Sequence, residues 1–332
     1  MSNGTVLRFC GVVVAGAWLG ACGPDAGTEA SSGSAKARSS GSARSSAATT
    51  ASAASTATAA ATATATAAPK DEGTAITKHY PAVGDKGTTA ETQVAEMKVD
   101  IKGPKGEFKE EATEAEQTEK AEECLAVTDK SCSKMKVTYT KAEKKVTTKD
   151  GKTKDSKVAH AGKTYVLELK DGAVAVTTED GKEPPKEELA AVKKDYKSFG
   201  KDGEILDAIP EKVKVGDSLD KLAQALASRA MDSENKPSKM DAKVTVKEFK
   251  TVDGKTIIVL DISMDAEGEE DNGGAIKVSM KGTIDLRADI GLPLKREMKG
   301  PVSVVFGEKA KGGVTGKAEG QMSLTSANTY SF

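Results

Sequence analysis

A regular alternation of apolar and polar residues toward the carboxyl end constrains the fold of this chain most. The apolar positions Ile276, Val278, Met280, Ile284 and Leu286 alternate with Lys277, Ser279, Lys281, Thr283, Asp285 and Arg287. Successive side chains of a strand point to opposite faces, so this spacing predicts a strand with one apolar and one solvated face. Such one-sided strands are typical of antiparallel sheets that are covered on a single face.

The same period recurs along the chain, around residues 135–139, 165–169, 258–264, 302–306 and 314–324. Turn signals separate these segments: Asp150-Gly151, Asp171-Gly172, Asp180-Gly181, Asp253-Gly254 and Asn272-Gly273. Asp-Gly and Asn-Gly pairs favour tight hairpin turns. The sequence therefore predicts hairpins and not βαβ units.

Three helices are expected between the strands. One begins at Pro185 and ends before Gly200, with Leu189, Val192 and Tyr196 on one face. A second follows Asp217 or Ser218, and a third is expected over residues 118–127.

The second helix presents Leu219, Leu222 and Leu226 at helical spacing, so we expect it to lie on the concave apolar face of the sheet. It would act there either as a fixed plug or as a movable lid over a ligand cavity. The small residues Gly316, Ala318 and Gly320 on one strand face would let a helix approach closely, which favours the plug.

The amino-terminal region has a different composition. Residues 9–19 form a short apolar stretch after a single arginine, as in a secretory signal, and Leu19-Gly20-Ala21-Cys22 follows. This motif resembles the lipobox of bacterial lipoproteins. The resemblance implies cleavage between Ala21 and Cys22, lipidation of the Cys22 thiol and anchoring to membrane lipid, and the residue after the cysteine, Gly23, indicates the outer membrane of a Gram-negative bacterium.

Residues 23–69 contain 18 Ala, 10 Ser and 8 Thr and no aromatic or large aliphatic residue. Such a segment cannot bury enough apolar surface to offset its ordering entropy, so we expect a disordered tether. The predicted organisation is a signal peptide over 1–21, the lipidated cysteine and tether over 22–69, and one globular domain over 70–332. Tyr80–Asp85 and Ile209–Asp217 look alike, so the domain either contains duplicated halves, about 75–200 and 205–332, or uses Val-Gly-Asp turn chemistry twice.

The lipobox, the tether and the sheet-rich domain with its segment 209–218 together resemble uncharacterised lipoproteins of myxobacteria and related bacteria. The domain is also similar to the half-barrel of periplasmic lipoprotein carriers, in which a curved antiparallel sheet wraps helices and encloses acyl chains. The expected fold class is therefore α+β: a curved, mainly antiparallel sheet, or half-barrel, covered by a few helices.

The sequence gives little support for nucleic-acid binding, membrane spanning, metal binding or catalysis. A net charge of −1 does not suit nucleic-acid binding, and 4% aromatic and 30% charged residues do not suit a polytopic membrane protein. Cys124 and Cys132 are candidates for a disulfide in an exported protein, with free thiols as the alternative. We interpret His79 and His160 as surface residues and the acidic run 265–271 as a solvated hairpin tip, and expect no metal, no cofactor and no enzymatic activity.

The leading functional hypothesis is an envelope lipoprotein that binds a lipid or peptide in a cavity of the sheet. The alternative is a structural or protein-interaction module of the cell envelope without a ligand.

Overall fold

The computed structural model of the protein describes residues 73–103, 106–231, 237–269, 274–306 and 315–332. The predicted signal peptide, the predicted cleavage and lipidation site at Ala21 and Cys22, and the tether lie outside these residues. The Asn272-Gly273 turn also lies outside them.

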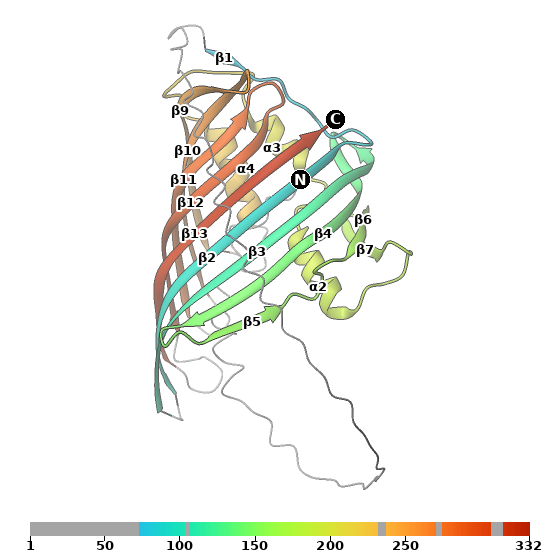
Figure 1. The fold of residues 1–332 in the computed structure, drawn as a ribbon. Helices are drawn as coiled ribbons and strands as arrows, with labels where there is room; N and C mark the ends of the chain where they lie inside the picture. Colours follow the sequence, from blue (N-terminus) through green and yellow to red (C-terminus); the bar gives the residue numbers. More distant parts are fainter. Residues whose placement is uncertain (1–72, 104–105, 232–236, 270–273, 307–314) are drawn as a thin grey trace, which may run out of the picture.

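One antiparallel sheet of 11 strands dominates the domain (Figure 1). Its strands are β2 (Lys86–Gly103), β3 (Gly106–Thr128), β4 (Ser131–Thr148), β5 (Thr153–Lys157), β6 (Thr164–Lys170), β7 (Ala173–Thr178), β9 (Lys239–Val252), β10 (Lys255–Glu269), β11 (Ala275–Arg287), β12 (Leu292–Phe306) and β13 (Thr315–Ser331). Two short strands, β1 (Thr74–Ala75) and β8 (Lys212–Val213), pair separately. The described helices are α2 (Lys186–Asp195), α3 (Asp202–Ala208) and α4 (Asp220–Met231).

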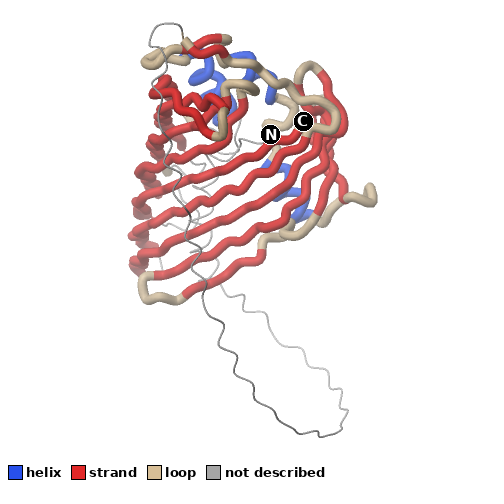
Figure 2. The backbone as a smooth tube through the Cα atoms, turned by 45° about the horizontal axis from the view of Figure 1, so that its top comes forward, coloured by secondary structure: helices blue, strands red, loops and turns tan. Residues whose placement is uncertain are grey.

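The strands follow the order β7-β6-β4-β3-β2-β13-β12-β11-β10-β9, with β5 beside β4. The first and last long strands therefore meet in the middle of the sheet, where Lys86 pairs with Ser331. The sheet stays open between β7 and β9, and it curves around the helices (Figure 2). The predicted curved antiparallel sheet with a few helices is confirmed, but the domain is richer in sheet than the α+β class implies.

The prediction of a helix over residues 118–127 is wrong, because this segment belongs to the 23-residue strand β3. Its Ala and Glu residues are strong helix formers in isolation, but β3 hydrogen-bonds to β2 on one side and β4 on the other. Tertiary pairing therefore overrides the local propensity. In turn, α3 was not expected from the sequence.

Glycines on the concave face serve the curvature of the sheet. A Cβ atom added to Gly300 would lie 1.8 Å from the carbonyl oxygen of Ser279, and one added to Gly320 would lie 1.9 Å from that of Glu96. The atoms nearest to Gly316 and Gly320 belong to β2 and not to a helix. We expected Gly316 and Gly320 to let a helix approach the sheet closely, and this expectation is wrong. Their lack of a side chain instead relieves crowding between neighbouring strands.

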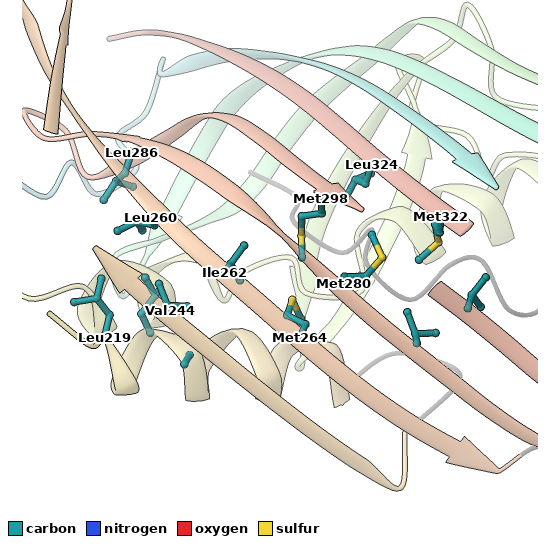
Figure 3. Close-up of a cluster of buried hydrophobic side chains, with 14 of the residues drawn as sticks. Leu219, Val244, Leu260, Ile262, Met264, Met280, Leu286, Met298, Met322 and Leu324 are labelled. Atoms are coloured by element: carbon teal, nitrogen blue, oxygen red, sulfur yellow. The ribbon is translucent and has the colours of Figure 1, made fainter. Parts of the chain in front are cut away.

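The interior forms two apolar clusters on the same side of the sheet. The larger, which we call the aliphatic core, lies on β2 and β9–β13 beneath α3 and α4. It includes five buried methionines: Met97, Met264, Met280, Met298 and Met322. Figure 3 shows several of these side chains projecting from neighbouring strands toward one another. The smaller cluster, which we call the tyrosine core, lies on β3, β4, β6 and β7 beneath α2, with Tyr139, Tyr165 and Tyr196 buried in it.

The two Val-Gly-Asp segments adopt the same turn. Gly84 and Gly216 have φ angles of 95° and 92°, in the left-handed region that glycine favours. In each turn the aspartate Oδ2 accepts a backbone hydrogen bond from three residues upstream, at 2.8 Å for Asp85 and 2.7 Å for Asp217. Each turn also exchanges two backbone hydrogen bonds with one strand residue, Cys124 of β3 or Val246 of β9. Duplication and repeated turn chemistry both account for this likeness.

Candidate functional site: a cavity beneath α3 and α4

A cavity of about 100 Å³ lies between the concave face of the sheet and the helices α3 and α4. Leu260, Ile284, Leu286, Asn328 and Tyr330 form its sheet side, and Ile205, Leu206, Leu222, Leu226 and Arg229 line it from the helices. The cavity is mostly apolar, but charged side chains that include Glu122, Asp202 and Arg229 also line it. Its volume is well below the roughly 300 Å³ at which ligand pockets begin.

The helix α4 is fixed to the sheet at its beginning. Immediately before it, the amide of Leu219 donates to the carbonyl of Val244, and the amide of Val246 donates to the carbonyl of Asp217. These bonds attach residues 216–219 to the edge strand β9. Within the described residues, no side chain of α4 forms a hydrogen bond to the sheet. Leu222 and Ala223 are buried against it and Leu226 is half-buried, so the body of the helix contacts the sheet through apolar side chains.

One ion pair joins the end of α4 to α3. Arg229 Nη2 lies 3.3 Å from Asp202 Oδ1, and the two side chains are 8% and 12% exposed. The α3 helix is in turn bonded to the rim, because Lys130 of the β3–β4 turn and Tyr80 both reach Asp207. The two helices therefore form a pair. The start of α4 is fixed to β9, α3 is fixed to the β3–β4 turn, and apolar side chains pack between the pair and the sheet.

A second buried ion pair crosses the sheet beside the cavity. Arg296 of β12 donates to Glu91 of β2 over 3.1 Å, and these side chains are 10% and 12% exposed. Burial and the nearby Arg229 lower the pKa of Arg296, against the opposing effect of Glu91. The Nε atoms of Arg229 and Arg296 and the Oε1 atom of Gln93 are buried without a hydrogen-bond partner in the described structure. Each such group costs on the order of 1–3 kcal/mol.

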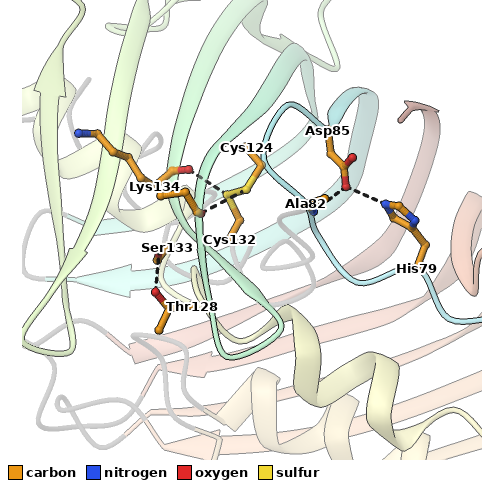
Figure 4. The surroundings of a disulfide bond; sticks show 9 residues. His79, Ala82, Asp85, Cys124, Thr128, Cys132, Ser133 and Lys134 are labelled. Carbon is orange, nitrogen blue, oxygen red and sulfur yellow. Dashed lines mark hydrogen bonds and ion pairs between the residues drawn. A yellow bond between two sulfur atoms is a disulfide. The ribbon is translucent and has the colours of Figure 1, made fainter.

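Cys124 and Cys132 are bonded as a disulfide with a Cα separation of 5.9 Å, across the β3–β4 hairpin. Both residues also line the cavity. The segment ahead of β2 crosses this end of the sheet, where His79 Nε2 lies 2.7 Å from Asp85 Oδ2 (Figure 4). The disulfide and this segment thus stiffen the rim of the cavity.

Polar bonds attach α2 to the strands of the tyrosine core. Tyr139 donates to Asp195 at 2.8 Å, and Tyr165 donates to Glu188 at 2.7 Å, so two carboxylates of α2 are tied to β4 and β6. Tyr196, just after the helix, donates to Glu122 of β3. Burial and the Glu122 carboxylate raise the pKa of Tyr196 well above its ordinary value, which keeps its hydroxyl a donor.

The expectation that His160 is a surface residue is wrong. Its ring lies 4.2 Å from that of Tyr139 and it is 6% exposed, because the segment before β6 folds back onto the tyrosine core. His79 is partly buried at the rim. The first residues of the acidic run lie on β10, and Glu269 pairs with Ala275 across the hairpin.

Of the residues proposed from the sequence, Leu219, Leu222 and Leu226 lie together on the aliphatic core. The sequence did not point to Glu91, Asp202, Arg229 or Arg296. A signal was present, because Arg229, Arg287 and Arg296 are the only arginines after residue 69 in a lysine-rich chain. Arginine is preferred over lysine for buried ion pairs.

Among the described residues, no group of three or more His, Cys, Asp and Glu side chains is placed to hold a metal ion. The helices in this part of the chain include none that is long and apolar enough to cross a membrane.

No family model matches the chain, and no curated protein matches it. Two solved structures are similar at low levels. One is a DUF1329 family protein from Desulfovibrio piger, 7% identical, with a TM-score of 0.12 over 72% of this chain and 83% of that one. The other is a domain from Vibrio parahaemolyticus whose description names outer membrane lipoprotein sorting, 8% identical, with a TM-score of 0.12 over 72% of this chain and 85% of that one. At these scores neither structure supports an assignment.

Proposed function

We propose that this protein is a non-enzymatic, lipid-anchored envelope lipoprotein that binds an acyl chain on the concave face of its half-barrel sheet. The observation that carries the proposal is the aliphatic core. Its concave face is continuous over six strands and is covered at the cavity by α3 and α4, and among the described residues the side chains of α4 make only apolar contacts with it. Methionine side chains adapt to apolar ligands of varied shape, and five of them lie on this face.

A long acyl chain requires more volume than the present cavity of about 100 Å³ provides. Binding therefore includes movement of α4 away from the sheet, while α3 keeps its hydrogen bonds to Ser131 and Lys130 at the rim. The end of α4 is the part that moves, because the residues before the helix are bonded to β9, and this movement breaks the ion pair between Arg229 and Asp202. Of the two roles considered from the sequence, the structure favours the movable lid.

The proposal is tested by native mass spectrometry of the full chain carrying Cys22→Ser, after incubation with a bacterial lipid extract. The substitution removes the thiol that would carry the protein's own acyl groups, so any acyl species retained is a ligand. We expect a bound acyl lipid. A chain that stays free of lipid at every extract concentration would instead favour the module of the cell envelope that acts without a ligand.

The anchor is proposed from the lipobox motif. Cys22→Ser is expected to leave the precursor uncleaved or to release the protein from membranes, because both processing and anchoring depend on that thiol. Metabolic labelling with a clickable palmitate analogue measures this directly. Label retained by the variant would refute lipidation at Cys22.

A further inference from the structure

Two arginines lie inside the concave surface, next to the cavity. Arg229 comes from α4 and lines the cavity, and its side chain is 8% exposed. Arg296 comes from β12, where it pairs with the cavity residue Ile284 on β11, and its side chain is 10% exposed. Lysine is the usual cation of this chain, so two buried arginines on opposite sides of one site are unusual for it.

The charges of these arginines are already matched. Asp202 pairs with Arg229, and Glu91 pairs with Arg296. A further anion would enter a buried site without a free cation to balance it, which is unfavourable in a poorly solvated interior. The site is therefore unsuited to an additional carboxylate or phosphate charge.

The hydrogen bonds of the same arginines are not complete. Each guanidinium uses Nη2 for its carboxylate, and its Nε–H is buried without an acceptor in the described structure. Two donors that lack acceptors, in a site with balanced charge, call for uncharged acceptor oxygens. Carbonyl oxygens of esters have this chemistry, and they sit at the head of the acyl chains of lipids.

We propose that Arg229 and Arg296 bind the ester carbonyl oxygens of an acylated lipid, whose hydrocarbon chain then lies on the apolar face of β2 and β9–β13. This inference rests on the acyl-binding role proposed above and adds the chemistry of the head group. It assigns one contact to the mobile helix and one to the fixed sheet. A bound ester would thereby bridge the lid and the sheet.

The test compares two ligands that differ only in the carbonyl group. Monopalmitoylglycerol has an ester carbonyl, and the matched hexadecyl glycerol ether has none. Binding of each to the full chain with Cys22→Ser is measured by displacement of a fluorescent fatty alcohol. We expect the ester to bind about tenfold more tightly than the ether, as hydrogen bonds to charged donors allow. Palmitate is expected to bind more weakly than the ester, because it brings an unmatched charge.

Arg229→Lys and Arg296→Lys keep the positive charge and remove the Nε–H donor. Each is expected to reduce the preference for the ester over the ether to about threefold or less, with the affinity for the ether unchanged. Arg287→Lys is the matched control, because Arg287 pairs with Asp289 outside the cavity. The Arg287→Lys variant should prefer the ester over the ether as strongly as the parent chain does. Thermal unfolding of all three variants checks that they remain folded.

The outcomes separate the two proposals. Equal affinity of the parent chain for the ester and the ether overturns the arginine site and leaves acyl binding standing. A preference that survives both lysine variants also overturns the arginine site. No binding of either ligand overturns the acyl-binding role and the arginine site with it. Titration with phosphatidylethanolamine and with a synthetic diacylglyceryl-cysteine peptide then distinguishes a membrane phospholipid from a lipidated protein as the source of the ester.

Discussion

The helices α2 and α4 cover the same face of one sheet, but they are attached by different chemistry. The carboxylates of α2 accept hydrogen bonds from buried tyrosines of β4 and β6. By contrast, α4 packs on aliphatic side chains, and among the described residues its hydrogen bonds to the sheet come from the residues that precede it. Directional bonds fix a helix in one position, whereas apolar contacts can be exchanged for those of an apolar ligand. The comparison is the basis for the proposal that α2 is a fixed part of the scaffold and α4 a movable cover.

The largest expected difference between the two regions comes from a matched pair of leucine truncations. Leu167→Ala, in the tyrosine core, removes a fully buried side chain and should cost about 2–5 kcal/mol. Leu226→Ala removes the same atoms from a half-buried side chain beside an existing cavity, and should cost about 1 kcal/mol or less. Denaturant unfolding measures both. A loss above about 2 kcal/mol for Leu226→Ala, without any change in lipid binding, would show that α4 is a fixed plug.

The next effect concerns the polar attachment of α2. Tyr196→Phe removes a donor from the buried Glu122 carboxylate and an acceptor from Lys120, and it leaves the ion pair between Glu122 and Lys120 at 2.8 Å. We expect a loss of about 1.5–3 kcal/mol, as for hydrogen bonds to charged groups. Urea unfolding measures the loss, and an unchanged free energy of unfolding would contradict the polar attachment of α2.

The smallest effect depends on pH. Hydrogen bonds from Lys163 and Tyr165 hold the pKa of Glu188 below its ordinary value of 4.5. A carboxyl group whose pKa is lowered by folding stabilises the protein above its unfolded pKa, and that contribution is lost as the pH falls through the folded pKa. Glu188→Gln should therefore cost about 1 kcal/mol at neutral pH and almost nothing well below pH 4. Equal losses at both pH values would show that the ionised form of Glu188 is not what holds α2.

Much of the sheet could be predicted from the sequence, because β4, β6 and β10–β13 alternate apolar and polar residues along their length. The strand β3 could not, since its Glu, Ala and Lys residues carry helical propensity, which its pairing with the neighbouring strands β2 and β4 overrides. The leucines of α4 were found through their spacing. The buried arginines were not, because each is distant in sequence from the carboxylate that pairs with it: Glu91 and Arg296 are 205 residues apart.

Native-state hydrogen exchange of the backbone amides in α4 and α2, with and without monopalmitoylglycerol, tests the central claim most directly. Without the lipid, amides over residues 222–230 should exchange faster than those over residues 189–195, because α4 opens locally while α2 opens only with the sheet. With the lipid, exchange in α4 should slow and exchange in α2 should stay the same. Equal exchange rates in the two helices, unaffected by the lipid, would contradict the account.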